Sequence, residues 1–171
     1  MEIRRLTGAD AAIYWPLRLR ALREEPEAFA SSFEEQRDYP LELAATRLRE
    51  AETAPDRAIF GAFDEHGQLL GMIGLVREQG AKSQHKAFIW GVYVVPEARG
   101  QGGGSALLKA ALDFACHIQG LEQVLLAVAA QNRAARALYL AAGFEIWGQE
   151  PLALKLGDRY IDEEHMIFFL Q

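Results

Sequence analysis

Cysteine is almost absent from the sequence, and histidine is rare and scattered. The single cysteine, Cys116, excludes an internal disulfide. It falls on the apolar stripe of a predicted helix, which indicates a small buried side chain rather than a nucleophile. Zinc sites need ligands at short spacing. The four histidines lie far apart along the chain, so we predict no metal site; they are His66, His85, His117 and His165.

Long hydrophobic runs and an excess of positive charge are missing too. No apolar run approaches the roughly 18 residues of a membrane span, and residues 1–5 lead into no signal-peptide core. We therefore predict a cytoplasmic protein without membrane contact. The 18 Lys and Arg residues against 24 Asp and Glu residues give a net charge of −6. This balance argues against a nucleic-acid partner held by bulk charge.

The composition that remains is that of an ordinary globular domain. Of the 171 residues, 50% are hydrophobic and 25% are charged. A chain of this length buries enough surface to form a core without disulfides or metals. Because the sequence contains no repeat, linker or low-complexity segment, we predict one domain over residues 1–171.

Several segments have the patterns of β-strands. Residues 58–63 and 69–76 flank a turn cluster and are typical of a β-hairpin. The continuous apolar run 124–129 is typical of a strand covered on both faces. Further strands are predicted over residues 2–6, 87–95, 144–147 and 166–170.

Segments with helical spacing of apolar residues lie between these strands. One predicted helix follows Asp10, its predicted cap, and begins or kinks at Pro16. A second predicted helix follows Pro40. Further helices are predicted over about 107–115 and 133–142, the latter ended by Gly143, while residues 26–39 form a loop or a short helix. The pattern predicts an α+β fold, a mixed and mostly antiparallel central sheet flanked by helices.

A glycine-rich turn joins the predicted strand 87–95 to the next helix. Glycines allow backbone N–H groups to converge, and a helix N-terminus adds about half a positive charge. Such a turn suits a phosphate or pyrophosphate, and Arg99 at its start is placed to add a charge-assisted bond. The alternative is a flexible turn capped by Ser105. The turn comprises Arg99, Gly100, Gln101, Gly102, Gly103, Gly104 and Ser105.

Two familiar phosphate-binding motifs do not fit this turn. A Walker loop ends in Gly-Lys-Ser/Thr, whereas this turn has no lysine. A dinucleotide fingerprint has the spacing GxGxxG and an acidic residue after the next strand. Here Gly100, Gly102 and Gly104 are spaced by two, and Glu122 precedes the strand 124–129. The hypothesis of a nucleotide-binding protein is therefore supported by the glycine turn alone.

Two motifs together resemble those of the GCN5-related N-acetyltransferases, the GNAT superfamily. Residues 99–104 (Arg-Gly-Gln-Gly-Gly-Gly) resemble its Arg/Gln-x-x-Gly-x-Gly/Ala motif, and residues 130–144 resemble its Asn-…-Ala-x-x-Leu-Tyr-…-Gly-Phe stretch. The segment 162–166 before the last strand is also similar, so the resemblance covers nearly the whole chain. The family usually has an aliphatic residue where Gly103 stands, which leads us to expect a more flexible position and weaker coenzyme affinity.

The resemblance implies a GNAT fold and transfer of an acetyl group from acetyl-CoA to a primary amine, by direct attack through a tetrahedral intermediate. Backbone groups of Val92, Tyr93 and Val94 would hold the pantetheine arm and supply an N–H to the oxyanion. Residues 99–105 would hold the pyrophosphate. Lys109, Arg133 and Arg136 are candidates for the remaining phosphate, or are solvated helix charges.

The resemblance also gives Tyr139 the role of general acid toward the departing thiolate. Asn132 lies about two helical turns before Tyr139, so both side chains are expected on one side of a helix, beside the glycine turn. We include Asn132 among the coenzyme-binding residues. The structural alternatives are a helix cap for Asn132 and a core aromatic for Tyr139.

The general base and the acceptor are not identified by these motifs. The strand 87–93 contains no carboxylate, which leaves Glu34, Glu35, His85 or a chain of water molecules to deprotonate the amine. The missing carboxylate also motivates a second hypothesis, a non-catalytic acyl-CoA-binding sensor. The acceptor is a small-molecule or peptide amine, and a homodimer is left open. A cluster of acidic residues hints at a cationic acceptor: Glu24, Glu25, Glu27, Glu34 and Glu35.

Overall fold

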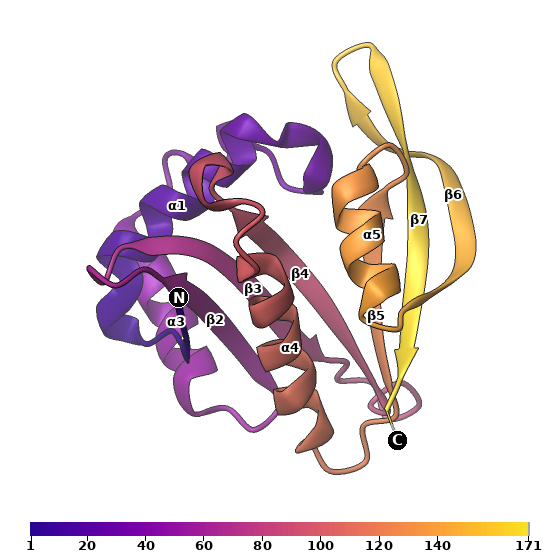
Figure 1. Cartoon of the computed structure of the whole chain (residues 1–171), viewed down its shortest axis with the longest axis horizontal. Helices are drawn as coiled ribbons and strands as arrows, with labels where there is room; N and C mark the ends of the chain where they lie inside the picture. The colour runs from indigo at the N-terminus through magenta and orange to yellow at the C-terminus, as the bar shows by residue number, and fades with distance from the viewer. Residues whose placement is uncertain (171) are drawn as a thin grey trace.

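The computed structural model describes residues 1–170, which form one mixed seven-stranded sheet (Figure 1). The strand order is β1-β2-β3-β4-β5-β7-β6. Only β4 and β5 pair in parallel, and every other neighbouring pair is antiparallel. The predicted α+β fold is therefore confirmed. The strands are β1 (Glu2–Arg5), β2 (Arg57–Phe63), β3 (Leu69–Arg77), β4 (Lys86–Val94), β5 (Gln123–Ala129), β6 (Glu145–Leu156) and β7 (Arg159–Phe169).

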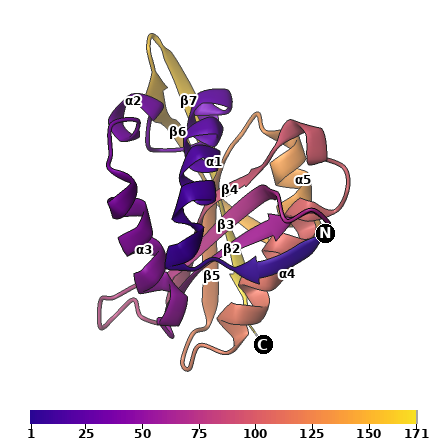
Figure 2. The same cartoon turned by 90° about the vertical axis from the view of Figure 1, so that its left-hand side faces the viewer.

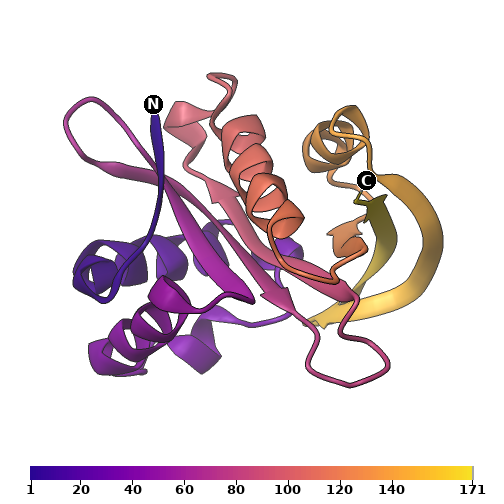
Figure 3. The ribbon, with the colours of Figure 1, turned by 90° about the horizontal axis from the view of Figure 1, so that it is seen from below.

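Helices cover both faces of the sheet (Figures 2 and 3). α1 and α3 lie on one face, and α4 and α5 lie on the other, so the buried apolar side chains divide into two clusters. Within residues 1–170, no helix has both the length and the apolarity to cross a bilayer. The helices are α1 (Ala11–Glu24), α2 (Phe33–Gln36), α3 (Leu41–Thr53), α4 (Gly103–Cys116) and α5 (Arg133–Ala141), with 3₁₀ turns η1 (Gly8–Asp10), η2 (Pro26–Ala28) and η3 (Pro96–Ala98).

The sheet opens between its two parallel strands. β4 and β5 pair only over residues 86–88 and 123–125, and beyond this point the strands separate. The register of β4 against β3 shifts in this region, where Gly91 has φ +65° and two residues of β4 stand opposite Ile73. A bulge of this kind bends the strand and leaves one residue outside the ladder. The separation creates the space in which the candidate site lies.

The start of α1 differs from the prediction. The helix already begins at Ala11 and contains Pro16 in its interior. Asp10 does not cap α1 through its side chain; its carboxylate accepts a hydrogen bond from Thr7 N at 2.8 Å and pairs with Arg4 at 2.7 Å. The Arg4 guanidinium lowers the pKa of Asp10 to about 2. Contacts with Thr7 and Arg4, three and six residues before Asp10, therefore replace the predicted cap of α1.

Other boundaries also shift. Residues 26–39 contain η2 and α2, so the short-helix alternative is correct there. The last two strands extend well beyond residues 144–147 and 166–170, because β6 and β7 pair with each other along a long, largely exposed hairpin that needs no continuous apolar face. Cys116 is exposed, and the prediction of a buried side chain is wrong. It is the last residue of α4 and lies at the margin of the buried stripe, as the partly buried Leu112 does.

Candidate functional site

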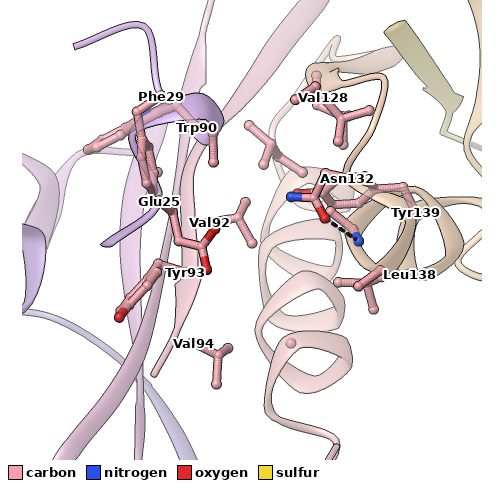
Figure 4. Close-up of a pocket in the computed structure, with 18 of the residues that line it drawn as sticks. Glu25, Phe29, Trp90, Val92, Tyr93, Val94, Val128, Asn132, Leu138 and Tyr139 are labelled. Atoms are coloured by element: carbon pink, nitrogen blue, oxygen red, sulfur yellow. Dashed lines mark hydrogen bonds between the residues drawn. The ribbon is translucent and has the colours of Figure 1, made fainter. Parts of the chain in front are cut away.

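A cavity of about 640 Å³ occupies the opening between β4 and β5. Its walls include residues 88–94 of β4 and 126–129 of β5. The glycine turn and the first residues of α4 contribute 102–105, α5 contributes Tyr139, and the segment after η2 contributes 28–31. Figure 4 shows side chains from β4 and α5 facing each other across this space. Segments that are far apart in the sequence therefore meet at one site.

The glycine turn forms one end of this cavity. Gly100 and Gly102 have φ values of +76° and +83°, a conformation that favours glycine, and both line the cavity. α4 begins at Gly103, and its first 5→1 bond runs from Ala106 N to Gly102 O at 2.9 Å. The N–H groups of residues 103–105 precede that bond and so have no partner within the helix. Gly102, not Ser105, occupies the cap position.

The remaining glycines and Gln101 have different roles. Gly103 is a buried first residue of α4, without positive φ, rather than the flexible point expected; a Cβ there would lie 2.8 Å from Met1 Sδ. A Cβ on Gly104 would lie 3.3 Å from Leu138 Cδ2, so this glycine lets α4 approach α5. Gln101 is exposed, lies outside the cavity lining, and its amide nitrogen donates to Glu97 O at 3.4 Å.

Arg99 lines the cavity but is bound within the chain. Its Nε donates to Val94 O at 3.0 Å, and its Nη2 pairs with Glu25 at 2.8 Å. These contacts tie the end of β4 to the C-terminal side of α1. In this structure Arg99 therefore holds the glycine turn against the rest of the fold, and the expected phosphate contact stays a prediction.

Tyr139 and Asn132 both line the cavity, as their spacing predicted (Figure 4). Tyr139 is 5% exposed, and its ring packs against Phe144 with centroids 6.0 Å apart. Burial raises the pKa of its hydroxyl, which therefore keeps its proton at neutral pH. Asn132 caps α5, its Oδ1 accepting a hydrogen bond from Ala135 N at 3.1 Å. Asn132 therefore caps α5 and also lines the cavity.

The segment Val92–Val94 also lines the cavity, from the strand side. The Tyr93 ring itself belongs to the core on the α1 face, and its hydroxyl donates to Glu24 at 2.6 Å. Burial and this carboxylate raise the pKa of Tyr93. Tyr93 thus lines the cavity mainly through its backbone in β4, next to the bulge.

The acidic groups that line the cavity are not the residues that the sequence offered as the general base. Within the part of the chain that the structure describes, Glu34, Glu35 and His85 lie outside the cavity lining. Glu35 instead accepts a hydrogen bond from Ser32 N at 2.8 Å in a capping box at α2. The carboxylates in the lining are Glu25, which pairs with Arg99, and Glu163 of β7.

Glu163 is the functional candidate that sequence reasoning missed. Burial raises the pKa of its carboxyl group, with His165 opposing and Glu150 reinforcing the shift. The register of β7 places Glu163 opposite Ala129, at the end of β5. The segment 162–166 was singled out as a motif, but only strand pairing brings one of its carboxylates to the cavity.

The three predicted contacts to the remaining phosphate are less favoured. Lys109 pairs with Asp113 one helical turn on, and Arg136 pairs with the buried Glu164. Arg133 is exposed at the start of α5. None of the three belongs to the cavity lining within residues 1–170, so the geometry favours backbone N–H groups as the anion-binding element.

Comparison with known proteins identifies the family. The model of the acetyltransferase (GNAT) family matches residues 19–144, and the chain belongs to this family. A mycothiol acetyltransferase from Salinispora tropica is 32% identical over 143 residues, which are 82% of this chain but only 43% of that protein. The chain thus spans less than half the length of this relative.

Solved structures share the fold over the whole chain. A GNAT-family acetyltransferase from Streptococcus pneumoniae superposes with a TM-score of 0.88 at 22% identity, covering 99% of both chains. YncA from Salmonella typhimurium, a putative acetyltransferase solved with its cofactor acetyl-CoA, superposes with a TM-score of 0.86 at 22% identity, covering 100% of this chain and 94% of that one. These likenesses confirm the predicted GNAT fold.

Proposed function

We propose that the protein transfers an acetyl group from acetyl-CoA to a primary amine, by direct attack of the amine through a tetrahedral intermediate. One observation carries the proposal: a single cavity joins the glycine turn at the start of α4 to a buried tyrosine and a half-buried carboxylate. An anion site and a proton donor and acceptor within one cavity are what acyl transfer from a phosphorylated carrier requires.

The glycine turn fits the diphosphate of acetyl-CoA. Gly100 and Gly102 have open space where a Cβ would stand, so a ligand can approach the backbone there. The N–H groups of residues 103–105 and the positive end of α4 would bind the diphosphate oxygens. The amide group of Asn132 faces the cavity (Figure 4) and would bind a part of the coenzyme other than the diphosphate. Bound there, acetyl-CoA supplies the activated acetyl group.

The strand side would orient the thioester. Backbone groups of Val92–Val94 would hold the pantetheine arm, and an N–H at the bulge would donate to the developing oxyanion. A bulge residue is suited to this role because its N–H group is not used in the ladder. The donor is fixed by the sheet and needs no rearrangement when charge develops.

Proton transfers would be divided between two side chains. Tyr139, a tyrosine that is protonated at neutral pH and lines the cavity, would donate to the departing thiolate. Glu163 would accept the proton of the attacking amine, since burial raises the pKa of its carboxyl group and makes it a stronger base than an exposed glutamate. Glu163 thus takes the role that the sequence left to Glu34, Glu35, His85 or water.

Binding and turnover test the proposal separately. Acetyl-CoA at about 100 times its Kd should stabilise the folded protein by about 2.7 kcal/mol, seen as a higher unfolding temperature. A panel of amines should then release free coenzyme A thiol in the presence of the enzyme. Stabilisation without turnover on any amine would favour the acyl-CoA sensor, and stronger stabilisation by ATP or NAD would favour a nucleotide-binding protein. The cytoplasmic location and a homodimer stay predictions.

A further inference from the structure

We infer that the amine acceptor also carries a carboxylate and that Arg18 binds it. Arg18 lies on α1, is only 7% exposed, and belongs to the lining of the cavity. This inference rests on the proposed function and names the class of its acceptor. The acceptors it predicts are amino-acid-like molecules, with the carboxylate close to the amine that is acetylated.

The guanidinium of Arg18 is incompletely satisfied by the protein. Its Nε donates to Gln36 Oε1 at 3.3 Å, but within residues 1–170 its Nη1 is buried without a hydrogen-bond partner. Buried donors are nearly always paired, because an unpaired donor forfeits the hydrogen bonds it made to water. A buried, unpaired arginine donor at a cavity therefore indicates a group supplied by a ligand.

Arg18 also lacks a neutralising charge. No ion pair among the described residues includes it. Burial lowers the pKa of Arg18, Tyr14 opposes this shift, and the nearby cation Arg47 adds to it, so the folded protein on balance disfavours the charge of Arg18. A buried charge without a counterion is costly to fold. A bound carboxylate removes that cost, and its planar shape suits the guanidinium.

The position of Arg18 separates it from the diphosphate site. Its guanidinium stacks on Phe29, 5.0 Å from the ring centroid. Figure 4 shows Phe29 and Trp90 at one end of the cavity and Val94, which leads to the glycine turn, at the other. A Cβ on Gly91 would lie 3.7 Å from Arg18 Nη1. The unpaired donor thus lies beside the bulge of β4, where the proposed function places the reacting thioester.

The acidic residues that hinted at a cationic acceptor do not oppose this inference. Glu24 accepts a hydrogen bond from Tyr93 and pairs with Arg20, and Glu27 pairs with Arg159. Glu25 pairs with Arg99 in the same way. These carboxylates are therefore neutralised within the chain, whereas the positive charge of Arg18 is not.

The test compares each L-amino acid with its own C-terminal amide, using the full chain and saturating acetyl-CoA. The two molecules share the amine and the side chain and differ in the carboxylate. For the preferred acceptor we expect kcat/KM about 100-fold higher for the acid, since a hydrogen-bonded charge pair contributes on the order of tenfold to 100-fold. Arg18→Gln should bring the acid-to-amide ratio close to one, and Arg18→Lys should give an intermediate ratio. The exposed Arg23→Gln, on the same helix, is the matched control and should retain the wild-type ratio.

The outcomes separate the two proposals. Amides acetylated as well as or better than their acids by the wild type would overturn the role of Arg18 while the N-acetyltransferase function stands. No acetylation of any amine would overturn both. If Arg18→Gln does not fold, the wild-type ratio still decides, together with thermal unfolding in the presence of coenzyme A. The preferred acid should raise the unfolding temperature under those conditions, and equal stabilisation by its amide would contradict the inference.

Discussion

The two ends of the cavity are built in different ways. At the glycine-turn end, one stretch of sequence from Arg99 to Ser105 contributes backbone N–H groups whose direction is set by positive φ at Gly100 and Gly102. Elsewhere in the lining, Arg18 comes from α1 and Glu163 comes from β7, and we propose that their side chains act on the acceptor. The backbone groups of the turn are therefore local in sequence, whereas the positions of these side chains depend on which elements pack together.

The arginines Arg99 and Arg18 also differ in whether the protein neutralises their charge. Arg99 near the glycine turn is paired with Glu25 and with a backbone carbonyl, so the proposed anion site at this end relies on backbone dipoles rather than on an unpaired cation. Arg18 at the other end has no paired carboxylate among the described residues. A general anion site can rely on backbone dipoles, but a side chain that selects one acceptor must be left free for it.

The first prediction concerns Tyr139, the proposed proton donor. Tyr139→Phe should lower kcat about 1000-fold while the Kd of acetyl-CoA stays nearly constant, because the ring still packs and only the donated proton is lost. Steady-state kinetics and acetyl-CoA titration measure the two quantities. The control is Tyr14→Phe, which removes the hydroxyl of a buried tyrosine outside the cavity lining. An unchanged kcat for Tyr139→Phe would remove Tyr139 from the acid role.

The second prediction concerns the acceptor end alone. Glu163→Gln should lower kcat about 100-fold, because the amide cannot accept the proton of the amine. Burial raises the pKa of Glu163 above its ordinary value of 4.5, so wild-type kcat should fall as the pH drops through that higher pKa. This acidic limb should be missing from the variant.

Stability provides a second readout for Glu163. Because the folded-state pKa is raised, protonated Glu163 stabilises the fold, and this contribution is lost as the pH rises through that pKa. Glu163→Gln should flatten this part of the pH–stability curve. The control is Glu145→Gln on the same hairpin, outside the cavity lining. An acidic limb that survives in Glu163→Gln would assign the base to another group.

The third prediction separates the glycines of the turn. Gly102→Ala should destabilise the protein by about 1–2 kcal/mol, because its φ of +83° is unfavourable for alanine, and should weaken acetyl-CoA binding about tenfold. Gly103→Ala, one residue later, should gain about 0.5–1 kcal/mol from helix propensity. Its Cβ would approach closely the flexible end of Met1, which can move, and would make an ordinary contact with Val94 Cγ1 at 3.9 Å. Chemical denaturation and acetyl-CoA titration compare the pair; equal effects would show that backbone conformation does not distinguish them.

Much of the fold was predictable because its signals are local. The apolar run 124–129 is part of β5, and Gly143 follows the end of α5 with φ +97°. Errors arose where a residue or strand has a competing partner: Asp10 binds the nearby Arg4 rather than capping α1, and β6 pairs with β7 over far more residues than its apolar residues indicate. Cys116 was misplaced because periodicity alone does not locate the margin of a buried stripe.

The residues of the candidate site also divide into those with local sequence signals and those that depend on distant packing. Residues 99–105, Asn132 and Tyr139 were found as motifs because a turn, a helix cap and a helix face each occupy a short stretch of chain. Arg18 and Glu163 were missed because their value lies in their surroundings. One is a buried cation without a counterion, and the other is a carboxylate whose pKa is raised by burial. Neither property belongs to a residue until the chain has folded.

The sequence by itself determined the element types, the family and the glycine turn that we propose as an anion site, because helix propensity, strand pattern and glycine conformation act over a few residues. Only the tertiary structure decided where β4 and β5 separate and which side chains enter the opening between them. Strand register and helix packing join residues more than a hundred positions apart, and desolvation then sets their charge and their reactivity.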